Sequence, residues 1–195
     1  MTRARTPEPA ALSREFYSRH SPDVARDLLG KVLTLRRGSR VLAATIIETE
    51  AYLGAEDAAS HAFRGPTRRA AIMFGPAGMA YIYLIYGMYH CLNAVTGSDG
   101  EGEAVLIRGL SPQLPQGWPP SRLDARRLAG PGRLCREFGI DLAMNGWDLT
   151  SSRLRIVKGM PVAPADVLVG PRVGIRSAAE LQLRFRVAPG PEPRR

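Results

Sequence analysis

Short stretches in which apolar and polar residues alternate run through much of the chain, and turn residues separate them. Residues 31–52 and 79–97 each hold two runs rich in β-branched and aromatic residues around a glycine, which predicts two β-hairpins. The same pattern predicts a strand at 102–112. Three shorter strands are expected toward the C-terminus, at 153–159, 172–177 and 181–188.

Three segments have the features of helices. Residues 13–30 predict a largely helical segment that restarts in its middle, where Ser21 can cap the second part. A short helix is expected at 67–75. Residues 121–140 predict two helical pieces separated by Gly-Pro-Gly, the second beginning at Arg133.

Hairpins and helices without alternating strand–helix–strand units favour an α+β fold. We expect a single domain at residues 11–188, with a mixed, mostly antiparallel β-sheet, surrounding helices and a protruding β-hairpin. A disordered arm is expected at 1–10 and a loose tail at 189–195.

Composition adds a strong positive charge to this picture. The 195 residues carry 27 Lys and Arg against 18 Asp and Glu, a formal charge of +9, which favours a polyanionic partner. Arginine supplies nearly all of it, because Lys31 and Lys158 are the only lysines; a GC-rich genome would produce the same bias. Cys91 and Cys135 are far apart, which argues against a disulfide scaffold and suits a reducing cytosol. No apolar run is long enough to predict a membrane span.

The strand near residue 50 ends in acids. In an extended strand Glu48, Glu50 and Tyr52 share a face about 7 Å apart, from a rise near 3.3 Å per residue. A partly buried carboxylate beside an aromatic ring suits a general base acting on a flat substrate. Two alternatives stay open: both glutamates face solvent or pair with arginines, or the acids hold a divalent metal. The candidate arginines are Arg36, Arg37 and Arg40, and the candidate ligands of Mg²⁺ or Mn²⁺ are Glu48, Glu50, Glu56, Asp57 and His61.

The second hairpin is rich in tyrosine. Tyr81 and Tyr83 share a face, and within a sheet such rings are usually half-buried packing. Tyr86 falls at the tip beside a glycine, where there is little core to pack against, so it can wedge into a base stack. Asn93 on the return strand can make a specific hydrogen bond or satisfy the backbone.

The motifs ETEAY, YGMYHCLN, VLIRGL, GPGRLCREFGI and PRVGI, with His61 between the first two, occur in an order that resembles the alkyladenine (3-methyladenine, methylpurine) DNA glycosylase family of the mammalian type. The resemblance runs from about Leu12 to Val187. It implies that Glu50 is the general base, with Arg108 and the backbone of Val173 near the catalytic water. It also implies that the pocket for the flipped base is formed by Tyr52, His61, Tyr83 and Asn93. Tyr86 is implied to be the side chain inserted into the duplex.

The implied reaction is the hydrolysis of the N-glycosidic bond of a damaged purine that has been flipped out of duplex DNA, which leaves an abasic site for base excision repair. The implied lesions are 3-methyladenine and other alkylated purines, hypoxanthine and ethenoadenine. Neither lysine falls in a catalytic-looking motif, so we expect no lyase activity. We expect a monomer at the bacterial nucleoid, in the cytoplasm, with no cofactor, metal or membrane partner. A metal-dependent nuclease and a non-catalytic nucleic-acid-binding module are the alternatives.

Overall fold

The structure, a computed structural model, describes residues 9–189. In this part of the chain eight strands form one sheet in which the pairs are antiparallel, and four short α-helices and four 3-10 turns surround it. The strands are β1 (Val32–Arg37), β2 (Arg40–Leu53), β3 (Ala80–Ile85), β4 (Tyr89–Thr96), β5 (Glu103–Ser111), β6 (Leu154–Val157), β7 (Val167–Gly170) and β8 (Arg184–Val187). The helical segments are α1 (Arg14–Tyr17), α2 (Ser21–Asp27), α3 (Ala125–Leu128), α4 (Pro131–Phe138), η1 (Gly54–Glu56), η2 (Ala71–Phe74), η3 (Leu142–Met144) and η4 (Pro164–Asp166). The predicted α+β domain is confirmed, as are both hairpins.

Strand β2 organises the sheet because it changes partners along its length. Its first half pairs with β1, up to Thr45 opposite Val32. Its second half lies between β5 on one side and β8 on the other, where Thr49 lies opposite Phe185. The register with β5 shifts around Glu48. This half of β2 is therefore a central strand of the sheet, and Thr49, Glu50 and Ala51 on it are completely buried.

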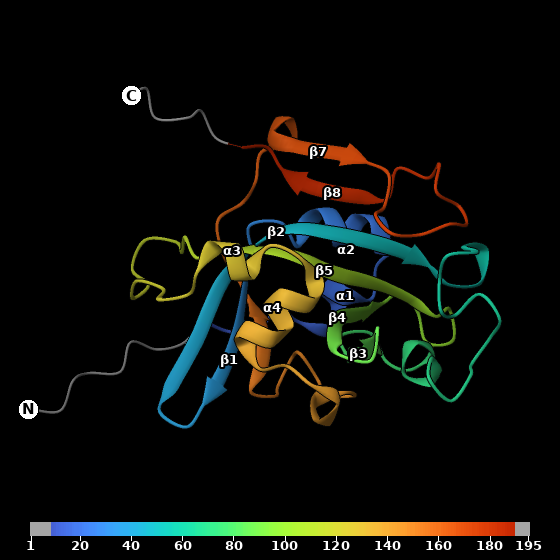
Figure 1. Cartoon of the computed structure of the whole chain (residues 1–195), viewed down its shortest axis with the longest axis horizontal. Helices are drawn as coiled ribbons and strands as arrows, with labels where there is room; N and C mark the ends of the chain where they lie inside the picture. The colour runs from blue at the N-terminus through green and yellow to red at the C-terminus, as the bar shows by residue number, and fades with distance from the viewer. Residues whose placement is uncertain (1–8, 190–195) are drawn as a thin grey trace, which may run out of the picture.

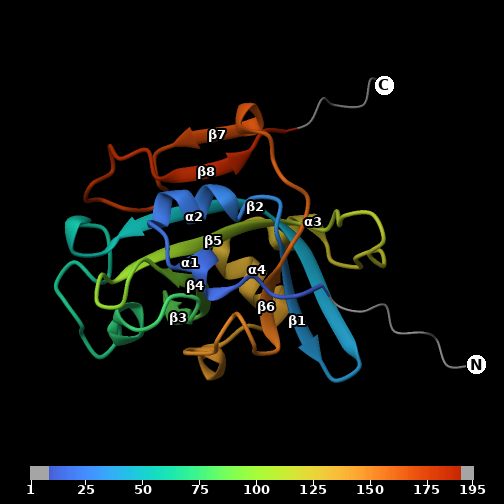
Figure 2. The ribbon, with the colours of Figure 1, turned by 180° about the vertical axis from the view of Figure 1, so that it is seen from behind.

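Helices cover both faces of the sheet. Figure 1 shows α3 and α4 in front of it, and Figure 2 shows α1 and α2 on the opposite face. The Thr49 hydroxyl donates a hydrogen bond of 2.8 Å to the Ala25 carbonyl of α2, so alternation turns Glu48 and Glu50 toward the other face. Most of the apolar core lies between these layers, and its largest fully buried side chains include Tyr17, Leu28, Ile46, Ile107 and Phe138.

Near the C-terminus one predicted strand is wrong and one observed strand was not predicted. Residues 172–177 do not form a strand; they belong to the loop between β7 and β8, where Gly174 has a φ of 78° that a strand does not allow. The strand that pairs with β8 is instead β7, which lies earlier in the chain and was not predicted from the sequence. In this loop the Val173 N–H binds the Glu50 carboxylate and the Ala178 carbonyl accepts a hydrogen bond from Arg172, so side chains take the place of a ladder partner for these groups.

Two helix starts also differ from expectation. Helix α4 begins at Pro131 rather than Arg133, because proline suits the first helical turn. Ser21 is the first residue of α2 and not its cap; its N–H is bound by the Glu103 carboxylate at 2.6 Å. The arm predicted at 1–10 and the tail predicted at 189–195 lie outside the described residues, except for Pro9, Ala10 and Pro189. Between residues 9 and 189 no helix has the length and apolarity to cross a membrane.

Candidate active site

Glu50 lies on β2 and is completely buried. Its Oε1 accepts a hydrogen bond of 2.8 Å from the backbone N–H of Val173, and its Oε2 accepts one of 3.1 Å from the Tyr52 hydroxyl. The Arg108 Nε lies 3.4 Å from Oε1. Burial raises the pKa of Glu50 above its ordinary value, although Arg108 and the Val173 N–H act in the opposite direction. A buried carboxylate with a raised pKa is a better proton acceptor than a free one.

Glu48 holds the arginine that approaches Glu50. Its Oε1 accepts hydrogen bonds from the Arg108 Nε at 3.1 Å and from the Arg184 Nε of β8 at 2.6 Å. The alternative partners expected from the sequence were arginines of the first hairpin; the arginines that bind Glu48 come instead from β5 and β8. Glu48 thus binds and orients two cations, and one of them faces the candidate base.

Arg108 reaches both glutamates because of an irregularity in the β2–β5 ladder. The register pairs Glu48 with Gly109 and Thr49 with Ile107, so Arg108 has no opposite residue. Such a bulge re-aims the side chain of the extra residue. Gly109 fits beside this bulge because a Cβ there would come within 3.1 Å of the Glu48 Cβ. The sequence VLIRGL therefore folds so that one cation is placed between two carboxylates.

A cavity of about 400 Å³ opens in front of Glu50. It brings together seven of the eight predicted site residues in its lining: Tyr52, His61, Tyr83, Tyr86, Asn93, Arg108 and Val173. Glu50 lies directly behind this lining and contacts three of its members, Tyr52, Arg108 and Val173. A cavity of this size is in the range that encloses a small ligand such as a purine base.

The cavity has an aromatic wall from β3 and the loop before η2. The Tyr83 ring packs edge-on against the His61 ring, with centroids 4.6 Å apart, and lies 5.4 Å from the Tyr81 ring. The Tyr81 hydroxyl and the His61 Nδ1 are 2.8 Å apart. Burial and the nearby charge of Arg69 lower the pKa of His61, so its ring is neutral at pH 7. The neutral imidazole then keeps its other nitrogen for a ligand.

Asn93 is fixed by the backbone of the facing strand. Its Nδ2 donates a hydrogen bond of 3.0 Å to the Tyr81 carbonyl, and its side chain is 3% exposed. One N–H of the amide is thus used structurally, while the oxygen and the second N–H remain for recognition. The two roles expected for Asn93, a specific hydrogen bond and satisfaction of the backbone, are thus both possible for the same side chain.

Tyr86 projects from the tip of the β3–β4 hairpin. Its side chain is 82% exposed, and its φ of 53° together with the φ of 68° at Gly87 is the conformation that a tight type I′ turn requires. Left-handed backbone is unfavourable for tyrosine, so a small residue would form this turn more easily. The hairpin is braced by α4, because Gly132 lies so close that a Cβ there would be 2.8 Å from the Tyr89 Cβ.

The other three candidate metal ligands, Glu56, Asp57 and His61, do not lie together with Glu48 and Glu50. Asp57 forms a buried ion pair with Arg172, Glu56 is exposed, and His61 turns to Tyr81. Within the described residues no group of three or more histidine, cysteine or acidic side chains has the arrangement of a metal site. The five candidate metal ligands are therefore not brought together.

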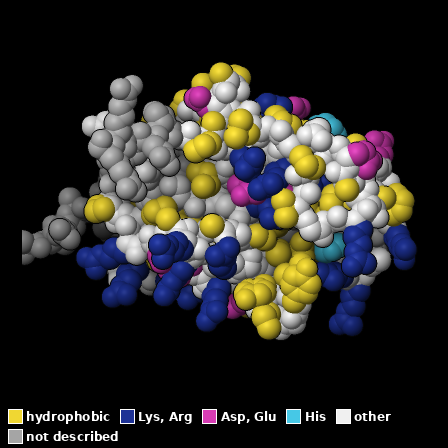
Figure 3. Space-filling view, turned by 45° about the horizontal axis from the view of Figure 1, so that its top comes forward, with side chains coloured by type: hydrophobic (Ala, Val, Ile, Leu, Met, Phe, Trp, Pro, Cys, Tyr) yellow, Lys and Arg dark blue, Asp and Glu magenta, His cyan; other side chains and the backbone are white. Residues whose placement is uncertain are grey.

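Arginines flank the hairpin on the protein surface. Figure 3 shows lysine and arginine side chains gathered on both sides of a protruding group of hydrophobic side chains. The exposed tip residues are Tyr86 and Met88. The exposed arginines nearby in the fold are Arg64, Arg68 and Arg69 in the segment before η2, and Arg122, Arg126, Arg127, Arg133 and Arg136 around α3 and α4.

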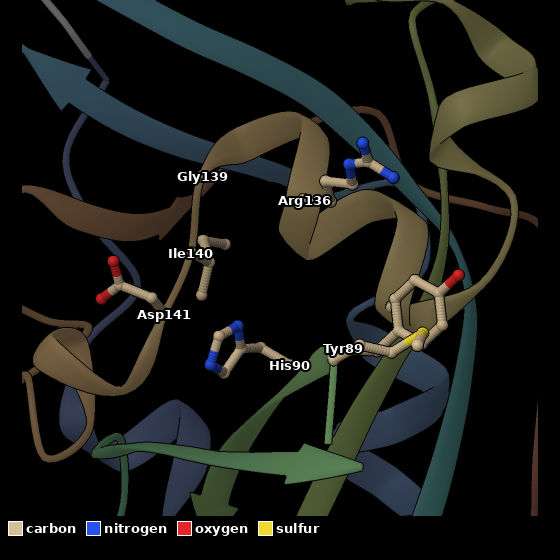
Figure 4. A pocket seen from close by; sticks show the side chains of 8 residues that line it. Tyr89, His90, Arg136, Gly139, Ile140 and Asp141 are labelled. Carbon is tan, nitrogen blue, oxygen red and sulfur yellow. The ribbon is translucent and has the colours of Figure 1, made fainter. Parts of the chain in front are cut away.

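A second hollow of about 370 Å³ lies beside α4. Figure 4 shows Tyr89 and His90 of β4 on one side of it, with Arg136 on α4 and Asp141 beyond the end of that helix. The Asp141 Oδ1 accepts a hydrogen bond from the N–H of Ala143, so this acid serves the start of η3. None of the predicted site residues lines this hollow, and the candidate chemistry stays in the larger cavity.

Three arginines of the site were missed by the sequence analysis: Arg69, Arg172 and Arg184. The Arg69 guanidinium lies over the Tyr83 ring, 4.9 Å from its centroid, and lines the cavity. Arg172 lies 4.7 Å from the centroid of the Tyr52 ring, and Arg184 binds Glu48. Arg172 could have been noticed, since it precedes Val173 in PRVGI; the other two stand among many arginines and give no signal.

The chain matches the family described as methylpurine-DNA glycosylase over residues 15–191. A protein of Myxococcus xanthus is 46% identical over 164 residues, which are 84% of this chain and 81% of the relative. A protein of Anaeromyxobacter is 49% identical over 178 residues, 89% of this chain and 87% of the relative. A third, from Carboxydothermus hydrogenoformans, is 44% identical over 179 residues, 89% and 93% of the two chains. All three bear the name "Putative 3-methyladenine DNA glycosylase".

Proposed function

This chain belongs to the methylpurine-DNA glycosylase family and is a DNA glycosylase of DNA repair, and we propose that it excises flipped-out damaged purines from duplex DNA with Glu50 as the general base. The proposed lesions are 3-methyladenine and other alkylated purines, hypoxanthine and ethenoadenine. The observation that carries the proposal is the buried Glu50 carboxylate, which lies against the wall of an aromatic cavity large enough for one base.

The chemistry needs a carboxylate at this place. Breaking an N-glycosidic bond builds positive charge on the sugar, which a nearby carboxylate stabilises. The same group can take a proton from the attacking water. The Oε2 of Glu50 accepts only the Tyr52 hydroxyl among the hydrogen bonds of the described residues, so it retains a lone pair for water. Arg108 and the Val173 N–H hold the carboxylate in one orientation.

Substrate capture follows from the surface around the cavity. A base that leaves the duplex costs a few kcal/mol of lost stacking and pairing, least at a damaged or mispaired site. Tyr86 projects far enough to fill the gap that the base leaves, and the arginines on either side suit the phosphates of both strands. The flipped base would stack in the cavity against the tyrosines that line it, where Asn93 excludes a purine with a 2-amino group.

We further propose that the enzyme acts without lyase activity and as a monomer. A lyase needs an amine for a Schiff base, and neither Lys31 nor Lys158 lines the cavity. All residues assigned to the site come from one chain, so a single copy can complete it. Borohydride trapping on lesion DNA tests the first statement, and sedimentation tests the second; a covalent adduct or a stable dimer would contradict them.

The proposed function is tested with duplex oligonucleotides that carry hypoxanthine or ethenoadenine, and with duplex DNA that carries 3-methyladenine. The protein is incubated with each in EDTA, and the DNA is divided into samples with and without alkali. Strand breaks that appear only after alkali are expected from a glycosylase. Breaks without alkali that disappear in EDTA would instead identify a metal-dependent nuclease, and binding without any product would identify a non-catalytic module.

A further inference from the structure

Arg172 is a buried arginine of the loop between β7 and β8, 5% exposed. Both of its terminal nitrogens bind the Asp57 carboxylate, Nη1 to Oδ2 and Nη2 to Oδ1 at 2.8 Å. Nη1 also donates to the Ala51 carbonyl at 3.0 Å, and Nη2 to the Ala178 carbonyl at 3.4 Å. The guanidinium is therefore held in one plane by the fork geometry that only arginine offers.

These contacts join three segments that meet at the candidate base. Ala51 lies between Glu50 and Tyr52 on β2, and Asp57 lies just beyond η1. Arg172 itself precedes Val173, whose N–H binds Glu50. The guanidinium also packs on the Tyr52 ring, and it does so from outside the cavity, because Arg172 is not part of the cavity lining. Two groups hydrogen-bond to Glu50, the Tyr52 hydroxyl and the Val173 N–H. Arg172 packs on the Tyr52 ring and directly precedes Val173 in the chain, so it is connected to both.

Stability alone is a poor reason for such a pair. Removing an arginine and an aspartate completely from water costs more than a surface pair does, and an apolar replacement of both is often no less stable. Burial acts to raise the pKa of Asp57, but the hydrogen bonds from Arg172 and the Ala59 N–H outweigh it and lower the pKa overall. The pair is therefore charged at neutral pH and keeps its geometry there.

We propose that Arg172 and Asp57 form a positioning pair, which holds the Val173 N–H against the Glu50 carboxylate and fixes the Tyr52 ring as a wall of the base cavity. The inference rests on the proposed function of Glu50. It gives Asp57, the buried acid three residues after ETEAYLG, a role in positioning the site without contact to the substrate. A displacement of about 1 Å in such a site can cost about a hundredfold in rate.

The pair acts through the environment of Glu50. Glu50 is faced by the Val173 N–H, the Tyr52 hydroxyl, Arg108 from β5, with Glu48 behind it, and Arg184 from β8. Loss of the positioning pair would withdraw the Val173 donor and loosen the Tyr52 ring, whose hydroxyl favours the same form, while Arg108 and Arg184 stay in place. Because this donor favours the carboxylate form, its loss moves the acid limb of the rate–pH profile to higher pH.

The test compares Arg172→Met, Arg172→Lys and Asp57→Asn with the wild type in single-turnover excision of hypoxanthine between pH 5 and 8. Arg14→Met is the matched control, because Arg14 also binds one carboxylate (Asp148, 2.6 Å) and one backbone carbonyl, away from the cavity. We expect Arg172→Met to lose about a hundredfold in rate with an acid limb at higher pH, and Arg172→Lys to recover part of both. Arg14→Met should keep the wild-type profile.

Amide exchange separates failure of the pair from failure of the proposed function. The Val173 N–H should be protected in the wild type and lose protection in Asp57→Asn, whether or not any lesion is excised. If the wild type excises nothing, the proposed function fails while this readout still tests the pair. Folded Arg172 variants with the wild-type profile and rate within about twofold, or unchanged Val173 protection in Asp57→Asn, would overturn the proposal.

Discussion

The Val173 N–H donates a hydrogen bond of 2.8 Å to the Glu50 carboxylate, across 123 residues of chain. The contact joins an exposed loop to the C-terminal part of β2, where the Glu50 carboxylate has no access to bulk water. Burial raises its pKa in consequence. This one relationship leads to expectations for both stability and rate.

Glu50→Gln should make the protein more stable at pH 8. A group whose pKa is raised on folding contributes most below its unfolded pKa and loses that contribution as the pH rises through the folded value. The ionised Glu50 therefore costs stability at neutral and alkaline pH, and a glutamine accepts the Val173 N–H without charge. We expect a gain of roughly 1 kcal/mol, about 2–4 °C in melting temperature, at pH 8 and almost none at pH 4. Thermal unfolding at both pH values measures it, and a less stable variant at pH 8 would contradict it.

Tyr86→Ala should slow excision from duplex DNA far more than from a single strand. The exposed ring is proposed to fill the gap left by the flipped base, and flipping costs a few kcal/mol only where the base is paired and stacked. A loss of about tenfold or more is expected on the duplex, since each 1.4 kcal/mol is tenfold. Single-turnover rates on both substrates measure it. Tyr86→Phe, which keeps the ring, is the matched control and should stay near the wild type; an equal loss on both substrates would exclude the wedge.

Asn93→Ser should allow the cavity to accept guanine, so that the enzyme excises this undamaged base more readily. The amide of Asn93 is fixed by its hydrogen bond to the Tyr81 carbonyl and cannot swing away from a 2-amino group. Pocket contacts of this kind discriminate by about tenfold or more. Release of guanine from undamaged duplex should rise relative to release of hypoxanthine, as measured by chromatography of the freed bases. Thr96→Val, a buried change on the same strand that does not line the cavity, should leave the ratio unchanged.

Arg69→Met should favour cationic over neutral lesions. The Arg69 guanidinium lies over the Tyr83 ring and lines the cavity, so its charge opposes a positively charged base there. The ratio of rates for 3-methyladenine, which is cationic in DNA, and hypoxanthine should rise by about three- to tenfold. Arg68→Met removes an exposed charge next to it that does not line the cavity, and serves as the control. Equal effects of the two variants on the ratio would show that general DNA attraction, not the cavity, is affected.

Much of the fold could be predicted because local patterns decided it. The glycine turns at Gly38 and Gly87 and the alternation around them predicted both hairpins. Alternation also placed Glu50 beside Tyr52, as their hydrogen bond confirms. The strand predicted at 172–177 failed because the conformation of that loop is set by the distant Asp57, which no local pattern reveals.

The site was predicted less completely, for a related reason. Strand alternation predicted Glu48 and Glu50 equally well as the general base, and only the family resemblance favoured Glu50. The two side chains differ in burial because of strands β5 and β8, which are far away in sequence. The position of Arg108 depends on a β-bulge that no local sequence pattern predicts. Arg69 and Arg184 could not be singled out in a chain with so many arginines.

The rate of the Glu50→Gln variant tests the central claim most directly. Single-turnover excision of hypoxanthine from a duplex is measured at saturating enzyme, together with binding of the same duplex, and Glu15→Gln on α1 serves as the control for loss of a carboxylate. Loss of a general base costs about 10²–10⁴-fold. The account predicts a loss of that order for Glu50→Gln with binding retained, and no loss for Glu15→Gln. A Glu50→Gln rate within a few-fold of the wild type would contradict it.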